Sequence, residues 1–174
     1  MSIHHPLLAK LARAEAALPA LLADAAGWEA LLVDYEPPTV ERLWRPWEDG
    51  RLSLHEIHPC AEDEAMYHPH KWPSAMRIVE GIYGMRIGSG HGMEPPPVGG
   101  YVELSAGDRY AMADPAGWHA VIPQGGPVLT VMATGPLWEQ PAAKKSSKPL
   151  GPLSPQRKEA LLRRFQGYYP PPRA

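Results

Sequence analysis

Three histidines at two places in the chain constrain its fold more than any other feature. One residue separates His68 from His70, and His119 closely follows the glycine Gly117 far downstream. Side chains alternate between the two faces of a strand, so His-x-His on a strand points both imidazoles to one side. A third histidine after a glycine turn can reach the same spot from a neighbouring strand. Three neutral imidazoles suit a divalent first-row metal and leave coordination positions open, so the sequence predicts a metal site.

Short strand-like segments separated by turn residues fill the middle of the chain. The 22 prolines and 16 glycines are typical of a protein with many turns. Short strands at this spacing predict a β-sandwich or a β-barrel. The expected strands are 40–44, 51–58, 76–80, 83–87, 101–104, 109–112, 118–122 and 128–133, with a turn at 48–50 and a loop at 88–100.

Helical patterns are expected before the strands. Leucines and alanines recur at spacings of three and four residues from Leu7 to Leu22, which predicts an amphipathic helix with a kink or split at Pro19. Gly27 is expected to end this run, and a second short helix is expected over residues 28–33.

A last helix is expected after an irregular stretch from Gly135 to Gly151. Ser154 is a suitable N-cap and Pro155 suits the first helical position. We expect both terminal helices to pack on the outside of the barrel or against a second subunit. The apolar stripe of the last helix is Leu161, Leu162 and Phe165.

These patterns divide the chain into three parts. Residues 1–36 form an N-terminal helical segment, residues 37–136 form the barrel, and residues 137–174 form a linker and a C-terminal helix. With 174 residues, the chain is long enough to bury a proper core.

Charge and cysteine content exclude several classes of protein. A formal net charge of −2 gives no indication of a nucleic-acid partner or an acidic membrane surface. We find no apolar run of membrane-spanning length and no signal-peptide pattern. Cys60 is the only cysteine, so no internal disulfide can form, and a cytoplasmic location is expected. The lysines Lys144, Lys145 and Lys148 lie among serine and proline, which favours a solvated linker over a binding patch.

The residues around the histidines resemble the cupin superfamily. Its first motif is G-x5-H-x-H-x3-4-E-x6-G, in which His68 and His70 match the histidine pair and Gly81 the last glycine, while Ser74 stands in place of the glutamate. The resemblance covers roughly residues 40–134. It implies a mainly β fold, a double-stranded β-helix (a jelly-roll-like barrel) with flanking N- and C-terminal helices. The second motif, G-x5-P-x-G-x2-H-x3-N, is matched loosely by Gly107, Pro115, Gly117 and His119.

A site with Ser74 in place of the glutamate is similar to the three-histidine centres of the thiol dioxygenases related to cysteine dioxygenase. Those enzymes oxidise a thiol to a sulfinate with O2 at Fe(II). In that family an arginine on an early strand holds the substrate carboxylate. Arg42 is the nearest match here and Arg45 is next. The planar guanidinium suits this role because it binds a carboxylate bidentately.

Two features depart from that family. Its catalytic tyrosine follows the third histidine by under twenty residues, whereas no tyrosine follows His119 until Tyr168. The histidine that the family has near the position of Thr134 is also missing. The resemblance therefore extends to the metal ligands but not to the whole catalytic set.

Two functions from different classes follow. The first is a mononuclear non-haem iron dioxygenase, in which His68, His70 and His119 bind Fe(II) and Arg42 binds a small anionic substrate such as a thiol. The alternative is a non-redox cupin that holds Zn, Ni or Mn for isomerisation, sensing or structure. A third interpretation is an interaction module without metal. The expected partner is a small molecule, without nucleic acid or membrane, and the apolar faces of the terminal helices favour a homodimer.

Other polar residues near the motifs have competing interpretations. Either His55 or His58 can orient a metal-binding histidine, although an edge or surface position is the simpler interpretation of each. Glu64 and Cys60 are minor alternatives as metal ligands. Glu80, next to a glycine, is expected to be a solvated turn residue. The remaining histidines, expected to be solvated, are His4, His5 and His91.

Core packing is the preferred interpretation of the apolar residues whose strand parity faces the barrel interior. Tyr83 and Trp118 are also candidates to shape the pocket. The interior-facing set is Met76, Ile78, Tyr83, Met85 and Ile87.

Overall fold

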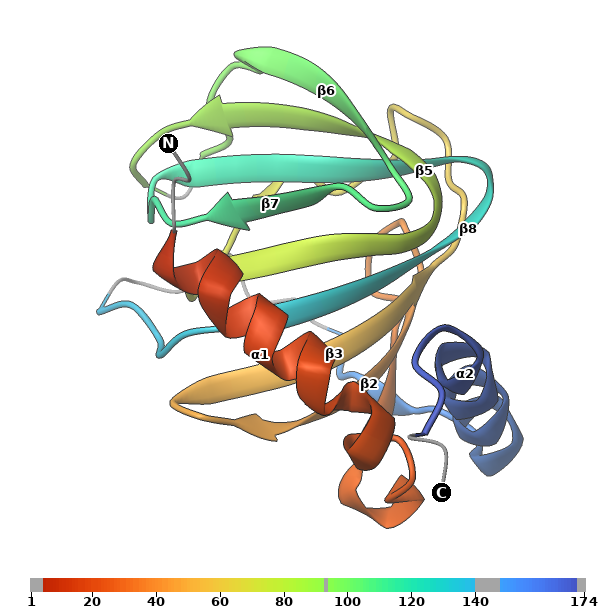
Figure 1. The fold of residues 1–174 in the computed structure, drawn as a ribbon. Helices are drawn as coiled ribbons and strands as arrows, with labels where there is room; N and C mark the ends of the chain where they lie inside the picture. The colour runs from red at the N-terminus through yellow and green to blue at the C-terminus, as the bar shows by residue number, and fades with distance from the viewer. Residues whose placement is uncertain (1–4, 93, 140–147, 172–174) are drawn as a thin grey trace.

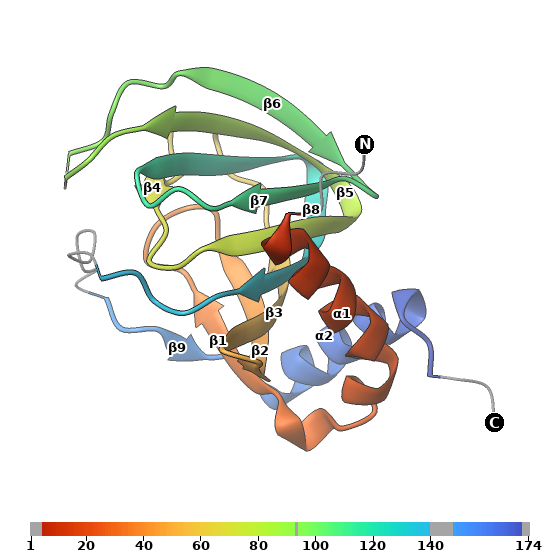
Figure 2. The ribbon, with the colours of Figure 1, turned by 60° about the vertical axis from the view of Figure 1, so that its left-hand side comes forward.

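A computed structural model describes residues 5–92, 94–139 and 148–171, and shows a bent antiparallel sheet with a helix at each end of the chain (Figures 1 and 2). The described residues form two α-helices, α1 (Pro6–Leu21) and α2 (Pro155–Tyr168), and a short 3-10 helix η1 (Ala25–Gly27). Neither α-helix is long and apolar enough to cross a membrane. The strands are β1 (Glu29–Val33), β2 (Val40–Trp47), β3 (Gly50–Ile57), β4 (His68–Pro69), β5 (Ser74–Ser89), β6 (Gly100–Ser105), β7 (Arg109–Met112), β8 (Gly117–Thr134) and β9 (Gly151–Pro152).

The two longest strands, β5 and β8, pair with each other along their whole length. The first half of β5 pairs with the end of β8, from Ser74↔Thr134 onwards, and its second half pairs with the start of β8. The register shifts on either side of Glu80, and Gly81 beside it has a φ of 88°. Glycine adopts this left-handed conformation at little cost, and a bulge of this kind bends a strand. Both strands therefore pass from one layer of the barrel into the other.

Each half of the β5–β8 pair supports its own layer. The first layer has the order β7-β5-β8-β3-β2-β1-β9, and the second has the order β6-β5-β8-β4. All of the strand pairs are antiparallel. Two antiparallel layers that share two bent strands form the predicted mainly β, double-stranded β-helix, with helices at both ends.

Both terminal helices pack on the outer face of the first layer. Leu18 of α1 and Phe165 of α2 are fully buried, and they belong to one apolar cluster with residues of β2, β3, β5 and β8. This confirms that the helices pack on the outside of the barrel, while the homodimer stays a prediction. The strand residues of the cluster are Leu43, Leu52, Leu54, Ala75, Leu129, Val131 and Ala133.

Buried carboxylates fix the two helices to the sheet. Glu15 of α1 accepts hydrogen bonds from Arg109 and Tyr169 and forms an ion pair with Arg77. These contacts join α1 to β5, to β7 and to the residue that follows α2. An ion pair also joins the other helix to the sheet, since Arg157 of α2 pairs with Glu41 of β2.

Glu80 is not the solvated turn residue that we expected. It lies inside β5 and accepts hydrogen bonds from Arg164 at 2.9 Å and from the Tyr168 hydroxyl at 2.8 Å. Arg164 also contacts Glu56 of β3 at 2.9 Å. The glycine after Glu80 marks a bulge within a strand, and the carboxylate pairs with α2 although 38% of the side-chain surface stays exposed.

The expected helix over residues 28–33 is wrong, because this segment forms strand β1. Glu29–Val33 pairs with β2 over five positions and with β9 on its other side. Pairing with two strands outweighs a local helical preference in so short a segment. The predicted split at Pro19 is wrong too, since α1 continues through Pro19 to Leu21, while a kink there stays a prediction.

Truncation of Phe165 tests the packing of α2. We expect Phe165→Ala to lower the free energy of unfolding by about 3–5 kcal/mol, because it leaves a cavity in a fully buried cluster. Urea denaturation measures the change. The exposed helix residue change Arg163→Ala is the control and is expected to cost less than about 0.5 kcal/mol. A cost below about 1 kcal/mol for Phe165→Ala would contradict the docked position of the helix.

Candidate metal centre

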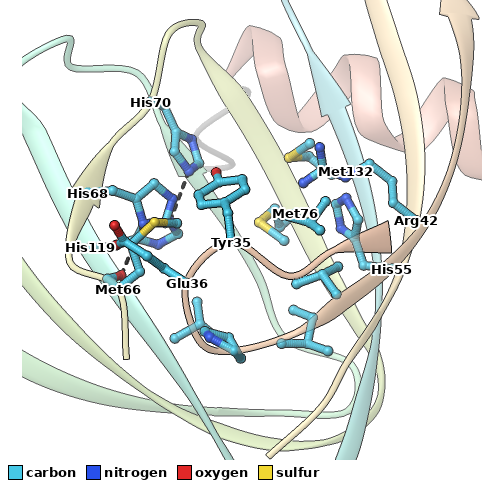
Figure 3. A pocket seen from close by; sticks show the side chains of 15 residues that line it. Tyr35, Glu36, Arg42, His55, Met66, His68, His70, Met76, His119 and Met132 are labelled. Atoms are coloured by element: carbon cyan, nitrogen blue, oxygen red, sulfur yellow. Dashed lines mark hydrogen bonds between the residues drawn. The ribbon is translucent and has the colours of Figure 1, made fainter. Parts of the chain in front are cut away.

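A cavity of about 120 Å³ lies between the two layers of the barrel (Figure 3). His68, His70 and His119 line one part of it, and Arg42 and His55 line another. The side chains between them are mostly apolar. The other lining residues are Val33, Tyr35, Glu36, Pro38, Val40, Ile57, Met66, Met76, Val121 and Met132.

The three histidines meet because β4 pairs with the start of β8. His68 lies opposite His119 in this pairing, so both side chains point to the same face. His70 follows β4, and its Nε2 lies 2.8 Å from Nε2 of His119. One ring nitrogen of each histidine lies within 4.8 Å of the others. The predicted convergence of the three histidines is confirmed, while their binding of a metal stays a prediction.

The other ring nitrogen of each histidine is held by a neighbouring group. Nδ1 of His68 donates to the carbonyl of Met66 at 3.1 Å, and Nδ1 of His119 lies 3.3 Å from the sulfur of Met85. Nδ1 of His70 lies 3.0 Å from the Ser74 hydroxyl. Such contacts fix the orientation of metal-binding histidines and leave Nε2 free for the ion.

Ser74 therefore has a defined place in the site, although it occupies the position of the cupin glutamate. Its side chain is 1% exposed and contacts His70 instead of pointing at the centre as a ligand. A site of three imidazoles, without a carboxylate, follows directly from this arrangement.

Burial keeps the three imidazoles neutral. It lowers the pKa of His70 to about 3, and the neighbouring His68 and Arg42 act in the same direction. It also lowers the pKa of His119 well below its usual value. For His68, burial lowers the pKa and the bond to Met66 partly opposes this shift. Neutral imidazoles are the form that binds a metal, so protons compete little at neutral pH.

The spacing of the nitrogens fits a first-row metal. Two nitrogens that are about 2.0–2.1 Å from one ion, at right angles, lie about 2.9 Å apart. The observed separation between Nε2 of His70 and Nε2 of His119 is 2.8 Å. These residues could therefore bind one ion as neighbouring ligands without a large movement of either ring.

Arg42 lies in the cavity, whereas Arg45 does not. Arg42 is half-buried on β2, and its buried Nε has no partner among the described residues. Burial lowers its pKa, while the nearby Tyr35 opposes this shift. Arg45 instead contacts Asp24 at 3.5 Å and lies over the ring of Trp28. Of the two sequence candidates, only Arg42 is placed to meet a ligand.

His55 and His58 lie in different environments. His55 is 3% exposed and lines the cavity, so the edge or surface interpretation is wrong for it. Its Nδ1 contacts the hydroxyl of Thr130 at 3.1 Å, and not a metal-site histidine. His58 lies 3.4 Å from Glu41, away from the cavity. Neither residue therefore orients one of the three histidines.

Several other predicted residues lie outside the site. Glu64 is exposed and Cys60 is partly buried, and neither belongs to the cluster that the described residues form. Tyr83 is fully buried and its hydroxyl donates to Tyr110 at 2.8 Å, as expected for a core residue. Trp118 packs against Tyr67 and donates to the carbonyl of Gly90, so it does not shape the cavity.

Among the remaining candidates, Met76 and Met85 are buried as predicted, but Ile87 is 40% exposed. His91 is exposed as expected. His5 caps α1, with its Nδ1 accepting from the backbone N–H of Leu7, and so is not merely solvated. His4 lies outside the described residues.

The connection between β1 and β2 adds residues that sequence reasoning missed. Tyr35 and Glu36 come from this connection and line the cavity. In the view of Figure 3, Tyr35 lies between the histidines and Arg42. No local sequence pattern marks the β1–β2 connection as part of a site, because only the tertiary structure brings it to the cavity.

Comparisons with known proteins identify distant structural similarities only. No protein-family model matches the chain, and no curated protein matches it. The solved structure of hydroxypropylphosphonic acid epoxidase from S. wedmorenis is 15% identical, with a TM-score of 0.46 over 63% of this chain and 56% of that one. KdgF from Halomonas sp. is 15% identical, with a TM-score of 0.43 over 59% and 85% of the two chains.

AerE from Microcystis aeruginosa is a third similar structure. It is 16% identical, with a TM-score of 0.47 over 73% of this chain and 54% of that one. The chain thus spans little more than half the length of AerE and of the epoxidase. At these low identities and TM-scores the similarities assign no function to this chain.

Ser74 offers a direct test of how the site is held. We expect Ser74→Ala to weaken the binding of a divalent metal by about 10–100-fold, because it removes the partner of Nδ1 of His70. Titration of the metal-free protein with Zn²⁺ measures this change. Ser53→Ala is the matched control, since Ser53 is also buried in the first layer but contacts none of the three histidines. Equal affinities of the two variants would show that Ser74 does not support the site.

Proposed function

We propose that the protein is a metal-dependent, cupin-like enzyme, a mononuclear non-haem iron dioxygenase that acts on a small anionic molecule such as a thiol. The observation that carries this proposal is the convergence of three imidazoles in a cavity that also holds Arg42, whose buried Nε has no partner among the described residues. Three neutral ligands leave the full +2 charge of the ion uncompensated. Such a site attracts an anionic donor atom, such as a thiolate.

The ligand set fits iron chemistry. Fe(II), bound by Nε2 of His68, His70 and His119, would supply the activation of O2. In the proposed reaction a thiol becomes a sulfinic acid: both atoms of O2 are transferred to sulfur, which loses four electrons as O2 gains four. No further reductant is needed, so the site requires no second cofactor.

The remaining cavity residues position the substrate and limit water. Arg42 provides a fixed positive charge for a substrate carboxylate. Apolar side chains such as Met76, Met132 and Val121 line the space between Arg42 and the histidines. Tyr35 offers a hydroxyl from the β1–β2 connection, where the thiol dioxygenases use a tyrosine from a later part of the chain.

A second candidate function rests on the same ligand set. Three histidines with an open fourth position are also a typical catalytic zinc site, at which a bound water is acidified to a pKa of about 7. A non-redox role with Zn, Ni or Mn is therefore the alternative. The identity of the metal and the consumption of O2 distinguish the two functions.

The metal content and the uptake of O2 test the proposed reaction. We expect the purified protein to contain iron and to consume O2 with members of a panel of small thiols and diketones. Elemental analysis and an oxygen electrode provide the measurements. His68→Ala combined with His70→Ala should abolish both signals. Bound zinc together with no O2 uptake after reconstitution with iron would reject the dioxygenase and support the alternative.

Exchange of Arg42 tests its contact with the substrate. We expect Arg42→Gln to raise KM for a thiol that carries a carboxylate by about tenfold or more, because a charge-assisted contact is lost. KM for a thiol without a carboxylate should change little. Arg45→Gln is the matched control, since Arg45 lies on the same strand but contacts Asp24. Similar KM values for Arg42→Gln and Arg45→Gln would exclude the proposed contact.

A further inference from the structure

We propose that His55 is a specificity-determining residue, which donates a hydrogen bond to the carboxylate of a small substrate held by Arg42. This inference rests on the proposed function in that it takes the cavity to be the substrate site. It assigns the cavity a ligand with a metal-binding donor at one end and a carboxylate at the other. No role in metal binding is assigned to His55.

The surroundings of His55 leave one ring nitrogen without a partner. Nδ1 contacts the hydroxyl of Thr130 on β8 at 3.1 Å, whereas Nε2 is buried and has no partner among the described residues. The side chain lines the cavity and lies close to Arg42 in Figure 3. A buried polar atom without a partner is costly, so a ligand that forms a hydrogen bond with it binds more tightly.

Arg42 lies opposite His55 on the neighbouring strand. The two residues are register partners in the β2–β3 pair, so both side chains point to the interior face. The Cβ atoms of such partners are about 4.5–5.5 Å apart, and one ligand group can contact both side chains. The buried Nε of Arg42 also has no partner in the part of the chain that the structure describes. The fold thus places two unsatisfied nitrogen groups side by side on one wall of the cavity.

The charge of this pair selects an anion with acceptor atoms. Arg42 carries the positive charge. Burial, assisted by the nearby Arg42, holds the pKa of His55 well below its usual value, so the imidazole is neutral. If the hydroxyl of Thr130 donates to Nδ1, the single proton of the neutral ring lies on Nε2. Nε2 is then a donor beside a guanidinium, which complements the two oxygens of a carboxylate.

The size of the cavity limits the ligand. A volume of about 120 Å³ corresponds to roughly 8–12 water positions at about 10–15 Å³ each. The space inside the cavity therefore accommodates about ten non-hydrogen atoms, which is enough for a short thiol carboxylate.

The test uses two probes that do not depend on the metal, butyrate and its neutral isostere butyramide. Both are titrated into the full-length protein after removal of metal by a chelator, and histidine ¹⁵N NMR follows the ring nitrogens of His55. We expect the wild type to bind butyrate at least about tenfold more tightly than butyramide. We expect His55→Leu to lose most of this preference. In the wild type, Nε2 should give the signal of a protonated nitrogen, and butyrate should shift this signal without loss of the proton.

Two further variants keep the result interpretable. Ser53→Ala, which changes a buried residue of the same strand that does not line the cavity, should keep the preference for butyrate. His55→Gln, which retains a hydrogen-bond donor, should keep part of it and replaces the leucine variant if that protein does not fold. Equal binding of the two probes by the wild type, or an unchanged preference in both His55 variants, would overturn the proposal.

Failure of the proposed function remains distinguishable from failure of this inference. A preference for butyrate that depends on His55, in a protein without iron or O2 uptake, would support the carboxylate contact and reject the dioxygenase. O2 uptake with a thiol, without any preference for butyrate, would support the dioxygenase and reject the role of His55.

Discussion

The pairing of β5 with β8 is the constraint on which the rest of the structure depends. These strands contribute to both layers of the barrel, and all other strands except β1, β2 and β9 pair with one of them. The pairing sets the positions of Ser74 at the start of β5 and of His119 near the start of β8. Because β4 pairs with the same end of β8, His68 and His70 arrive beside His119. The site is thus a product of the register of one strand pair.

Polar groups in this barrel are distributed unequally between its two faces. Outside the first layer, buried carboxylates such as Glu15 and Glu41 are paired with arginines of the helices or of the sheet. Inside, Arg42 and His55 retain buried nitrogens without partners among the described residues. Other buried nitrogens without partners occur among the described residues, on Trp47, Arg77 and Arg86, but only Arg42 and His55 place two of them on one cavity. Such groups are costly in a stable core, so this pair is a candidate contact for a ligand.

Local sequence patterns were sufficient to predict the cluster of three histidines and most strands. His-x-His on a strand and a histidine after a glycine turn predicted the convergence of His68, His70 and His119. The helix start at Ser154 and the burial of Phe165 followed from capping and periodicity in the same way. The resemblance to cupins added Arg42, which the structure places in the cavity, and Arg45, which it does not.

The features that the sequence did not reveal depend on contacts between distant segments. Residues 28–33 form a strand only because β2 and β9 pair with them. A strand was expected to end just before Gly81. Instead β8 pairs with β5 on both sides of this glycine, which marks a bulge. His55 lies within β3 and lines the cavity, whereas His58 follows the end of β3 and does not. Tyr35 reaches the cavity through a connection whose path no local pattern encodes.

X-ray absorption spectroscopy of the protein loaded with one equivalent of Zn²⁺ tests the central claim, that Nε2 of three histidines holds one metal ion. We predict a first coordination shell that contains three imidazole nitrogens at about 2.0–2.1 Å, with the remaining position filled by oxygen. A shell with fewer than three imidazoles, or with sulfur at about 2.3 Å, would contradict the claim.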